Sequence, residues 1–255
     1  MAVLGWALVL SSAVPLMVAA RANRATTLFP AVLWGAVAWV GWAVALAEPG
    51  RATTYAALGL TGCAGVAVLG ARRPGMAAWN FVVAGLLAVL ALPLAESLAF
   101  DIPLHLDTFR WVFLLALIGI TVINYLPTRL TAGAAFLGVA CAWGMDLLAS
   151  GAGNRLVIVT CCAGLAPWAA WAGYRVTRDA GSPFDRLWRD FRDRFGLIWG
   201  LRLREQFNRA ADNADLGLEL TWSGARPTGP AAGTTAVDGP AYDTLAALMK
   251  RFGLP

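Results

Sequence analysis

Ionisable side chains within apolar stretches are the first candidates for chemistry in this chain. Glu96 lies near the end of the apolar run 76–98, and Asp146 lies near the end of the run 131–150. A charged side chain at such a position is costly in a bilayer, so it indicates a functional site by default. His105 lies in the polar segment 101–110 after the first of these runs, and an imidazole titrates near neutral pH. These three residues together predict an ion or proton site.

The two acids also have a simpler explanation. Each lies close enough to the end of its run for the carboxylate to reach water or to pair with an arginine of a neighbouring segment. The arginines available on that side are Arg51, Arg110 and Arg155. This explanation predicts solvated or paired carboxylates at the rim of a helix bundle, without a ligand.

The histidine, cysteine and acidic residues of the sequence do not indicate a metal or cofactor site. The spacing of Glu96, Asp146 and His105 matches no pattern of metal ligands, so we expect no metal site. His105 is the only histidine, which excludes a bis-histidine haem within this chain. The cysteines lie inside apolar runs without a CxxC spacing, as is typical of small buried residues. They are Cys63, Cys141, Cys161 and Cys162. We therefore expect no cofactor.

Composition places these candidates in a membrane. The 255 residues are 59% hydrophobic and only 14% charged, and the mean hydropathy is +0.64, which is typical of an integral membrane protein. The net charge is +5, but the basic residues are spread over several connections instead of forming one patch. This distribution argues against a nucleic-acid partner and favours a lipid bilayer.

Apolar runs predict an all-α, polytopic helical bundle with about seven transmembrane helices. A run of arginines follows the first apolar segment instead of preceding it, so we expect that segment to be a retained span, although Ala20-Arg21-Ala22 resembles a cleavage site. The fifth run has only 16 apolar residues and needs its flanks to cross about 30 Å of hydrocarbon. The predicted spans are 1–20, 28–47, 52–70, 76–98, 111–126, 131–150 and 156–176.

Arginine distribution predicts the orientation of these spans. Seven arginines fall on one side of the predicted bundle and three on the other, which places the N-terminus outside and the C-terminus in the cytoplasm. The Arg- and Ala-rich usage, with Lys250 as the only lysine, indicates a bacterial inner membrane. The larger group is Arg21, Arg24, Arg72, Arg73, Arg129, Arg175 and Arg178, and the smaller group is Arg51, Arg110 and Arg155.

The segment 183–214 has the pattern of amphipathic surface helices. Large apolar residues recur at spacings of three and four, with charged residues on the opposite face. Aromatic residues opposite arginines are typical of a helix at the lipid headgroups, although the same face would also suit packing on the chain's own segments or on a partner. The predicted membrane-surface residues are Phe184, Trp188, Phe191, Phe195 and Trp199. The pattern slips after Gly200, so we expect two helices joined near Gly196 and Gly200.

The chain thus divides into a seven-span domain, 1–176, and a cytoplasmic tail, 177–255. Within the tail we expect one short strand at 218–222, a flexible linker at 223–239 and a terminal helix at 240–252. The tail is too short for a kinase or cyclase domain and has no Gly-rich phosphate loop.

No motif resembles a known family, and no catalytic motif is present. The interpretation we favour is a non-catalytic subunit, scaffold or assembly component of a membrane complex, with other membrane subunits as partners. One alternative is a small-solute or ion transporter that uses the acidic residues near the outer face. A second alternative is an intramembrane enzyme.

Overall fold

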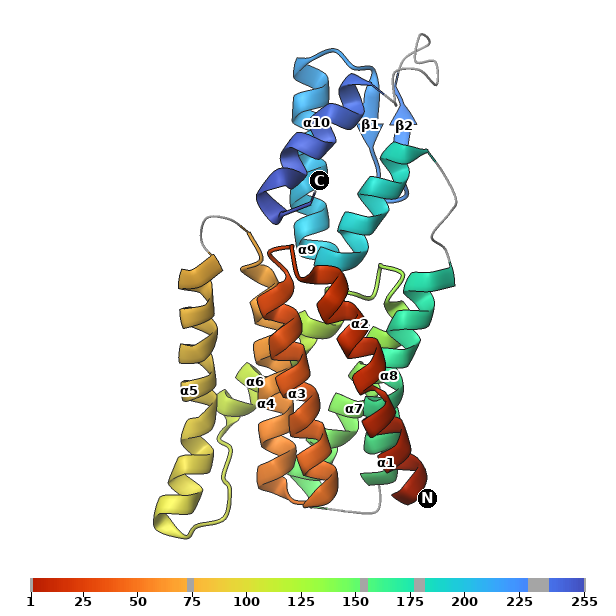
Figure 1. The fold of residues 1–255 in the computed structure, drawn as a ribbon. Coiled ribbons are helices and arrows are strands. Elements are labelled where there is room, and N and C mark those ends of the chain that lie inside the picture. Colours follow the sequence, from red (N-terminus) through yellow and green to blue (C-terminus); the bar gives the residue numbers. More distant parts are fainter. Residues whose placement is uncertain (1, 73–75, 152–155, 177–181, 229–238, 255) are drawn as a thin grey trace.

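The protein is nearly all-α, with a helix bundle that carries a smaller C-terminal unit at one end (Figure 1). The computed structural model describes residues 2–72, 76–151, 156–176, 182–228 and 239–254. Within these ranges, six helices are long and apolar enough to cross a membrane. The bundle helices are α1 (Ala2–Ser11), α2 (Ala13–Asn23), α3 (Phe29–Ala47), α4 (Arg51–Leu69), α5 (Met76–Phe100), α6 (Thr108–Ile123), α7 (Thr131–Ser150) and α8 (Leu156–Val176).

The span count differs from the prediction of about seven. Helices α1 and α2 form one candidate span, Gly5–Asn23, and α3, α4, α5, α7 and α8 supply the other five. Helix α6 is apolar but has only 16 residues, which is shorter than the roughly 20 residues that a transmembrane helix needs. The multi-pass helical architecture is therefore confirmed, whereas the predicted count of about seven spans is not: six of the described helices have the length and composition of a span.

A proline explains the break between α1 and α2. Pro15 has no N–H to donate to the carbonyl of Ser11 in the preceding turn, so the helix is interrupted at Ser12. The Ser12 hydroxyl lies 2.6 Å from both the carbonyl oxygen of Leu8 and that of Gly164 in α8. The indole N–H of Trp168 donates to Ser11 Oγ. The break is therefore where the first span attaches to α8.

Helix α4 lies at the centre of the bundle and packs against α3, α5, α6 and α7. Small residues set its close approach to α6, because a Cβ at Gly62 would lie 2.9 Å from Leu117 and one at Gly65 would overlap Thr121. Helix α7 approaches α8 in the same way, since a Cβ at Gly133 would lie 2.6 Å from Ala170. Helix α5 packs mainly along α4 and stands at the edge of the bundle (Figure 1).

Residues 182–254 form the C-terminal unit. Its long helix α9 (Pro183–Asn213) bends at Gly196, where φ is +79° and ψ is −168°, so the two halves point in different directions. Strand β1 (Leu218–Leu220) pairs antiparallel with β2 (Ala225–Pro227). Helix α10 (Pro240–Met249) and the 3-10 turn Lys250–Phe252 then pack back on α9.

Most predicted elements of this unit are present. The strand within 218–222 is confirmed, and so is the helix over 240–252, which ends in a 3-10 turn. The prediction of a linker over 223–239 is wrong at its start, because residues 225–227 form the second strand. Residues 229–238 of that linker lie outside the described residues, as do Arg73, Arg155 and Arg178.

The apolar face of α9 is covered by the chain itself and does not form an open surface. Phe184, Trp188, Phe191 and Phe195 are fully buried, and Trp199 is 5% exposed. Phe252, in the 3-10 turn after α10, is the common neighbour of Phe191, Phe195 and Trp199, with its ring 4.9 Å from Phe191 and 5.2 Å from Trp199 between centroids. The bend at Gly196 and the return of α10 thus replace the predicted lipid contact of these five residues with a protein core.

Candidate functional site

The predicted acidic site lies at the end of the bundle far from the C-terminal unit, and there Glu96 is paired with an arginine. Arg110, at the start of α6, approaches both carboxylate oxygens of Glu96 at 3.0 Å. Asp107 caps α6 by accepting from the Arg110 backbone N–H, and its carboxylate lies 3.8 Å from Arg110 Nε. The Glu96 side chain is 45% exposed. This geometry matches the simpler explanation of a paired carboxylate at the rim.

His105 and Asp146 are not joined to Glu96 by a described contact. His105 is exposed, and only its backbone carbonyl takes part, accepting from Arg110 at 3.4 Å. Asp146 is half-buried on α7, which packs on α8, α4 and α6, whereas α5 packs mainly on α4. Over the described ranges, no three His, Cys, Asp or Glu side chains are grouped as metal ligands. The ion site therefore remains a prediction without supporting geometry.

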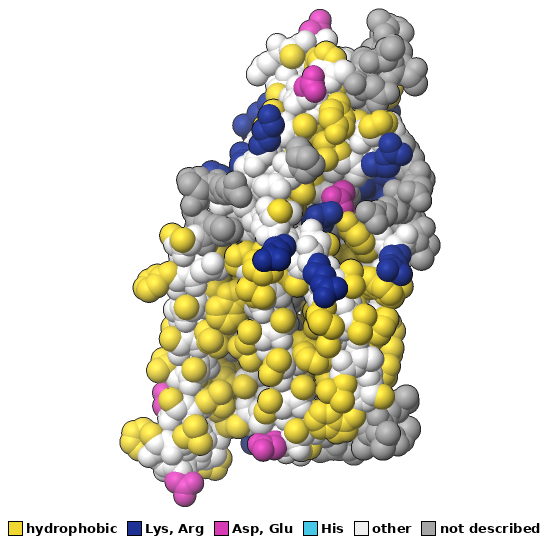
Figure 2. All heavy atoms as spheres, viewed as in Figure 1, with side chains coloured by type: hydrophobic (Ala, Val, Ile, Leu, Met, Phe, Trp, Pro, Cys, Tyr) yellow, Lys and Arg dark blue, Asp and Glu magenta, His cyan; other side chains and the backbone are white. Residues whose placement is uncertain are grey.

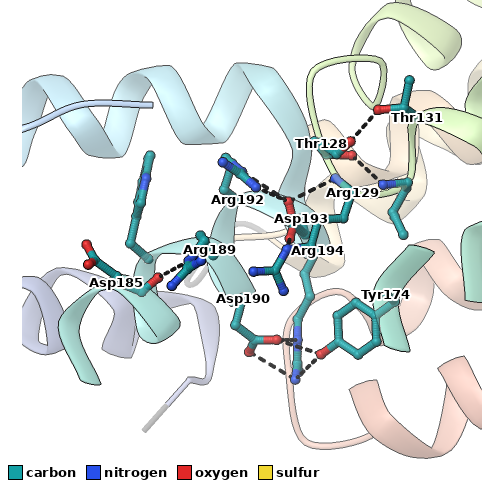
Figure 3. Close-up of polar contacts among 12 residues, drawn as sticks. Thr128, Arg129, Thr131, Tyr174, Asp185, Arg189, Asp190, Arg192, Asp193 and Arg194 are labelled. Atoms are coloured by element: carbon teal, nitrogen blue, oxygen red, sulfur yellow. Dashed lines mark hydrogen bonds and ion pairs between the residues drawn. The ribbon is translucent and has the colours of Figure 1, made fainter. Parts of the chain in front are cut away.

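The densest polar geometry lies instead at the opposite end, where α9 meets the connection between α6 and α7. We call this region the junction, defined by Asn124–Leu130, Tyr174 and residues 190–198 (Figure 3). Asn124 follows α6, and its backbone carbonyl accepts from the Leu197 N–H at 2.7 Å. Its side-chain oxygen accepts from the Ile198 N–H at 3.0 Å. These two amides begin the second half of α9 and lack helical acceptors, so Asn124 caps that half from another segment.

The bend in α9 depends on Gly196. Its positive φ falls in the region that favours glycine. A Cβ at this position would also overlap the amide group of Asn124. Glycine therefore permits both the change in helix direction and the close approach of Asn124.

Asp193 is the charged centre of the junction. Its side chain is fully buried, and Arg192 Nη2 lies 2.9 Å from one carboxylate oxygen. Arg129 approaches the other oxygen at 3.2 Å with its Nε, and its backbone N–H donates to Asp193 at 3.2 Å. Arg192 also donates to the carbonyl of Trp222 at 2.8 Å. Two arginines and one backbone amide thus compensate a carboxylate that has no access to water.

A second cluster links α8 to α9 beside Asp193. The Tyr174 hydroxyl donates to Asp190 at 2.6 Å, and Arg194 lies 3.0 Å from the same carboxylate and 3.1 Å from the Tyr174 oxygen (Figure 3). Burial lowers the pKa of Arg194, but Asp190 and Tyr174 raise it by more, so the net shift is upward. The Tyr125 hydroxyl donates to the Arg194 carbonyl at 3.1 Å. Arg194 therefore stays charged near neutral pH.

Three further contacts attach the C-terminal unit to the bundle. Trp199 Nε1 donates to the carbonyl of Val68 at 3.0 Å, and Trp222 Nε1 donates to the carbonyl of Pro127 at 2.8 Å. The carbonyl of Phe252 accepts from both the backbone N–H and the hydroxyl of Thr27 at 3.0 Å. Because these contacts come from α4, the α6–α7 connection and the α2–α3 connection, they hold the unit in one orientation.

An apolar cavity of about 300 Å³ lies within the bundle between α2, α3, α4, α6, α7 and α8. A second space of about 240 Å³ shares part of its lining and reaches Tyr174, Asp193 and Arg194. The walls are mostly Ala, Gly, Leu, Val and Trp, so the cavity can hold hydrocarbon.

Sequence reasoning missed the junction. Helical periodicity places Arg192 and Asp193 on the charged face of a predicted amphipathic helix, where solvent would surround them. The structure pairs Asp193 with Arg192 and Arg129 instead. The available signal was the polar sequence Asn124-Tyr125-Leu126-Pro127 directly before Arg129, which interrupts two apolar runs.

Comparisons of the chain with protein-family models, with curated proteins and with solved structures gave no match.

Proposed function

We propose that this protein is a non-catalytic component of a membrane complex, which holds its C-terminal unit at one membrane face and offers helix α5 to another membrane subunit. The proposal combines the favoured interpretation of the sequence with two features of the structure. One is the attachment of the C-terminal unit through the junction, and the other is the position of α5.

Helix α5 carries the proposal. It packs mainly along α4, and its outer face exposes Phe81 (81%), Val89 (55%) and Leu92 (52%). Gly85 lies among them, and a Cβ added there would meet nothing within 4 Å. Large apolar side chains around a small residue allow a second helix to approach closely where lipid gives no hydrophobic drive to association. We therefore assign the partner as a membrane-spanning helix of another subunit.

The orientation that we propose follows from the arginines. Arg21, Arg72, Arg129 and Arg175 lie near the end of the bundle that carries the C-terminal unit, and on the face shown in Figure 2 the dark-blue side chains gather along that border. By the positive-inside rule this end is cytoplasmic, and the membrane is the bacterial inner membrane. We further propose that α6 crosses as a seventh span with help from its flanking residues. Reporter fusions after residues 73 and 178 would then be cytoplasmic, and one after residue 153 external.

Photo-crosslinking in native membranes tests the assignment of α5. A photoreactive residue at Phe81 or Val89 should give one discrete crosslinked membrane protein, which mass spectrometry identifies. The same probe at Val37, which is 46% exposed on α3, should crosslink to lipid alone. Gly85→Phe should abolish the protein crosslink because the ring blocks close helix approach. Absence of a protein product from α5, or the same product from Val37, would contradict the proposal.

A further inference from the structure

The two apolar spaces in the bundle adjoin each other, and we treat them as two lobes of one cavity. They share lining residues from four segments, including Leu16, Leu28, Leu130 and Pro167. One lobe extends to Trp42 and Thr61 in the interior, and the other ends at Tyr174 and Arg194 in the junction. The cavity is therefore apolar in its interior lobe and polar at its junction end, so it matches a molecule with an apolar tail and a polar head.

The deep lobe has the size and chemistry of a hydrocarbon site. Its volume of about 300 Å³ lies at the lower end of small-molecule pockets, which is roughly 300–1,000 Å³. Apolar cavities stay dry and bind apolar molecules, so water is not the expected occupant. The indole nitrogen of Trp39, a lining residue, is buried without a hydrogen-bond partner among the described side chains. An acyl chain fits these walls.

Charge at the shallow end favours an anion. Arg175 stacks on Trp171, a lining residue, with its guanidinium carbon 3.8 Å from the ring centroid. Arg21 directly precedes the lining residue Ala22, and both arginines are exposed. Within the described residues neither has an ion pair with a carboxylate, whereas Asp190 is already paired with Arg194. Arg21 and Arg175 thus place positive charge without a carboxylate partner next to residues that line this end of the cavity, at the depth where lipid headgroups lie.

We propose that this cavity binds one anionic phospholipid, with an acyl chain in the deep lobe and the phosphate near Arg21 and Arg175. Its polar end abuts the junction, so the lipid would contact both the bundle and the C-terminal unit. The inference does not depend on the proposed role of α5, because no residue of α5 lines the cavity as described.

Lipid retention tests the proposal on the full-length protein. The wild type and its variants are purified in mild detergent, exposed to equal amounts of phosphatidylglycerol and phosphatidylcholine, washed, and analysed by native mass spectrometry. Gly35 lines the deep lobe, and a Cβ there meets nothing within 4 Å, so Gly35→Phe should place its ring in the cavity without a backbone clash at Cβ. Gly85→Phe is the matched control, because Gly85 has equally open surroundings but lies on α5.

The wild type and Gly85→Phe should each retain one phosphatidylglycerol, and Gly35→Phe should retain about tenfold less, since the ring displaces several methylenes. If Gly35→Phe does not fold, Gly35→Leu should give a smaller loss in the same direction. Arg21→Gln with Arg175→Gln should abolish the preference for phosphatidylglycerol. Equal retention by Gly35→Phe and Gly85→Phe, or equal binding of both lipids by wild type, would overturn the proposal. Gly85→Phe separates this outcome from the proposed function, because it should lose the α5 crosslink and keep the lipid.

Discussion

The ion pairs at the two ends of the helix bundle differ in their exposure to solvent. At the far end, Glu96, Asp107 and Arg110 form a local cluster whose members are partly exposed and lie within 14 residues of one another. At the junction, Asp193 is fully buried and is paired with Arg129, which is 64 residues away in the chain. The first cluster can exchange its partners for water, and the second cannot.

This difference shows that a buried ion pair constrains the structure more than an exposed one does. An exposed ion pair contributes little to stability because water competes for both partners. A buried pair is costly to form, but removal of one member leaves an uncompensated charge in a dry site. Asp193 therefore holds α9 in one position against the α6–α7 connection, because moving α9 would separate it from Arg129. Glu96 does not fix α5 in the same way, because water can replace Arg110 as its partner.

Asp193→Ala should lower the stability of the protein more than any other substitution proposed for the two ends of the bundle. It removes the only carboxylate that faces Arg129 and Arg192 in the described contacts, and leaves the buried Arg192 and the partly buried Arg129 without a matching charge. We expect a loss of about 3–5 kcal/mol in the free energy of unfolding of the C-terminal unit. Denaturant titration in detergent, followed by the fluorescence of the buried tryptophans, measures it. A loss below about 1 kcal/mol would place this ion pair in the same class as an exposed one.

Asn124→Ala should have an intermediate effect. The substitution removes the side-chain acceptor for the Ile198 N–H but keeps the backbone carbonyl that accepts from Leu197. We expect a loss of roughly 1–2 kcal/mol, which is the usual contribution of a helix N-cap. The same titration applies, with Asn80→Ala on α5 as the control asparagine. An equal change in both variants would argue against a capping role for Asn124.

Glu96→Gln should have the smallest effect. Its carboxylate is 45% exposed, so the exposed pair with Arg110 should contribute about 0–1 kcal/mol. A thermal-shift series across pH and common cations should therefore show little difference from wild type. The transporter hypothesis expects the reverse, namely a cation- or pH-dependent stabilisation that both Glu96→Gln and Asp146→Asn abolish.

Much of the fold follows from apolar run length. The helices predicted at 28–47, 131–150 and 156–176 agree with α3, α7 and α8 to within one residue, because nothing but a helix satisfies the backbone of such a run in lipid. A bend in this region was also predictable, since the apolar stripe changes phase after Gly200, and the structure places it at Gly196. The short strand β2 was not, because three residues in a Gly- and Pro-rich segment pair only when β1 is already in place.

The candidate site was less predictable than the fold. Helical periodicity correctly grouped Phe184, Trp188 and Phe191 on one face, but it cannot say whether lipid or protein covers that face. Asp193 lay on the predicted polar side, and its burial results from Arg129 and from the connection after Asn124. Contacts between segments so far apart leave no periodic signal in the chain.

Amide hydrogen exchange at Leu197 and Ile198, measured on the full-length protein in lipid nanodiscs, tests most directly whether the junction holds the C-terminal unit to the bundle. Amides in the first turn of a helix lack helical acceptors and exchange quickly unless another group caps them. Because both donate to Asn124, our account predicts slow exchange at Leu197 and Ile198 in the wild type, and faster exchange at Ile198 in Asn124→Ala. Fast exchange of both amides in the wild type would contradict it.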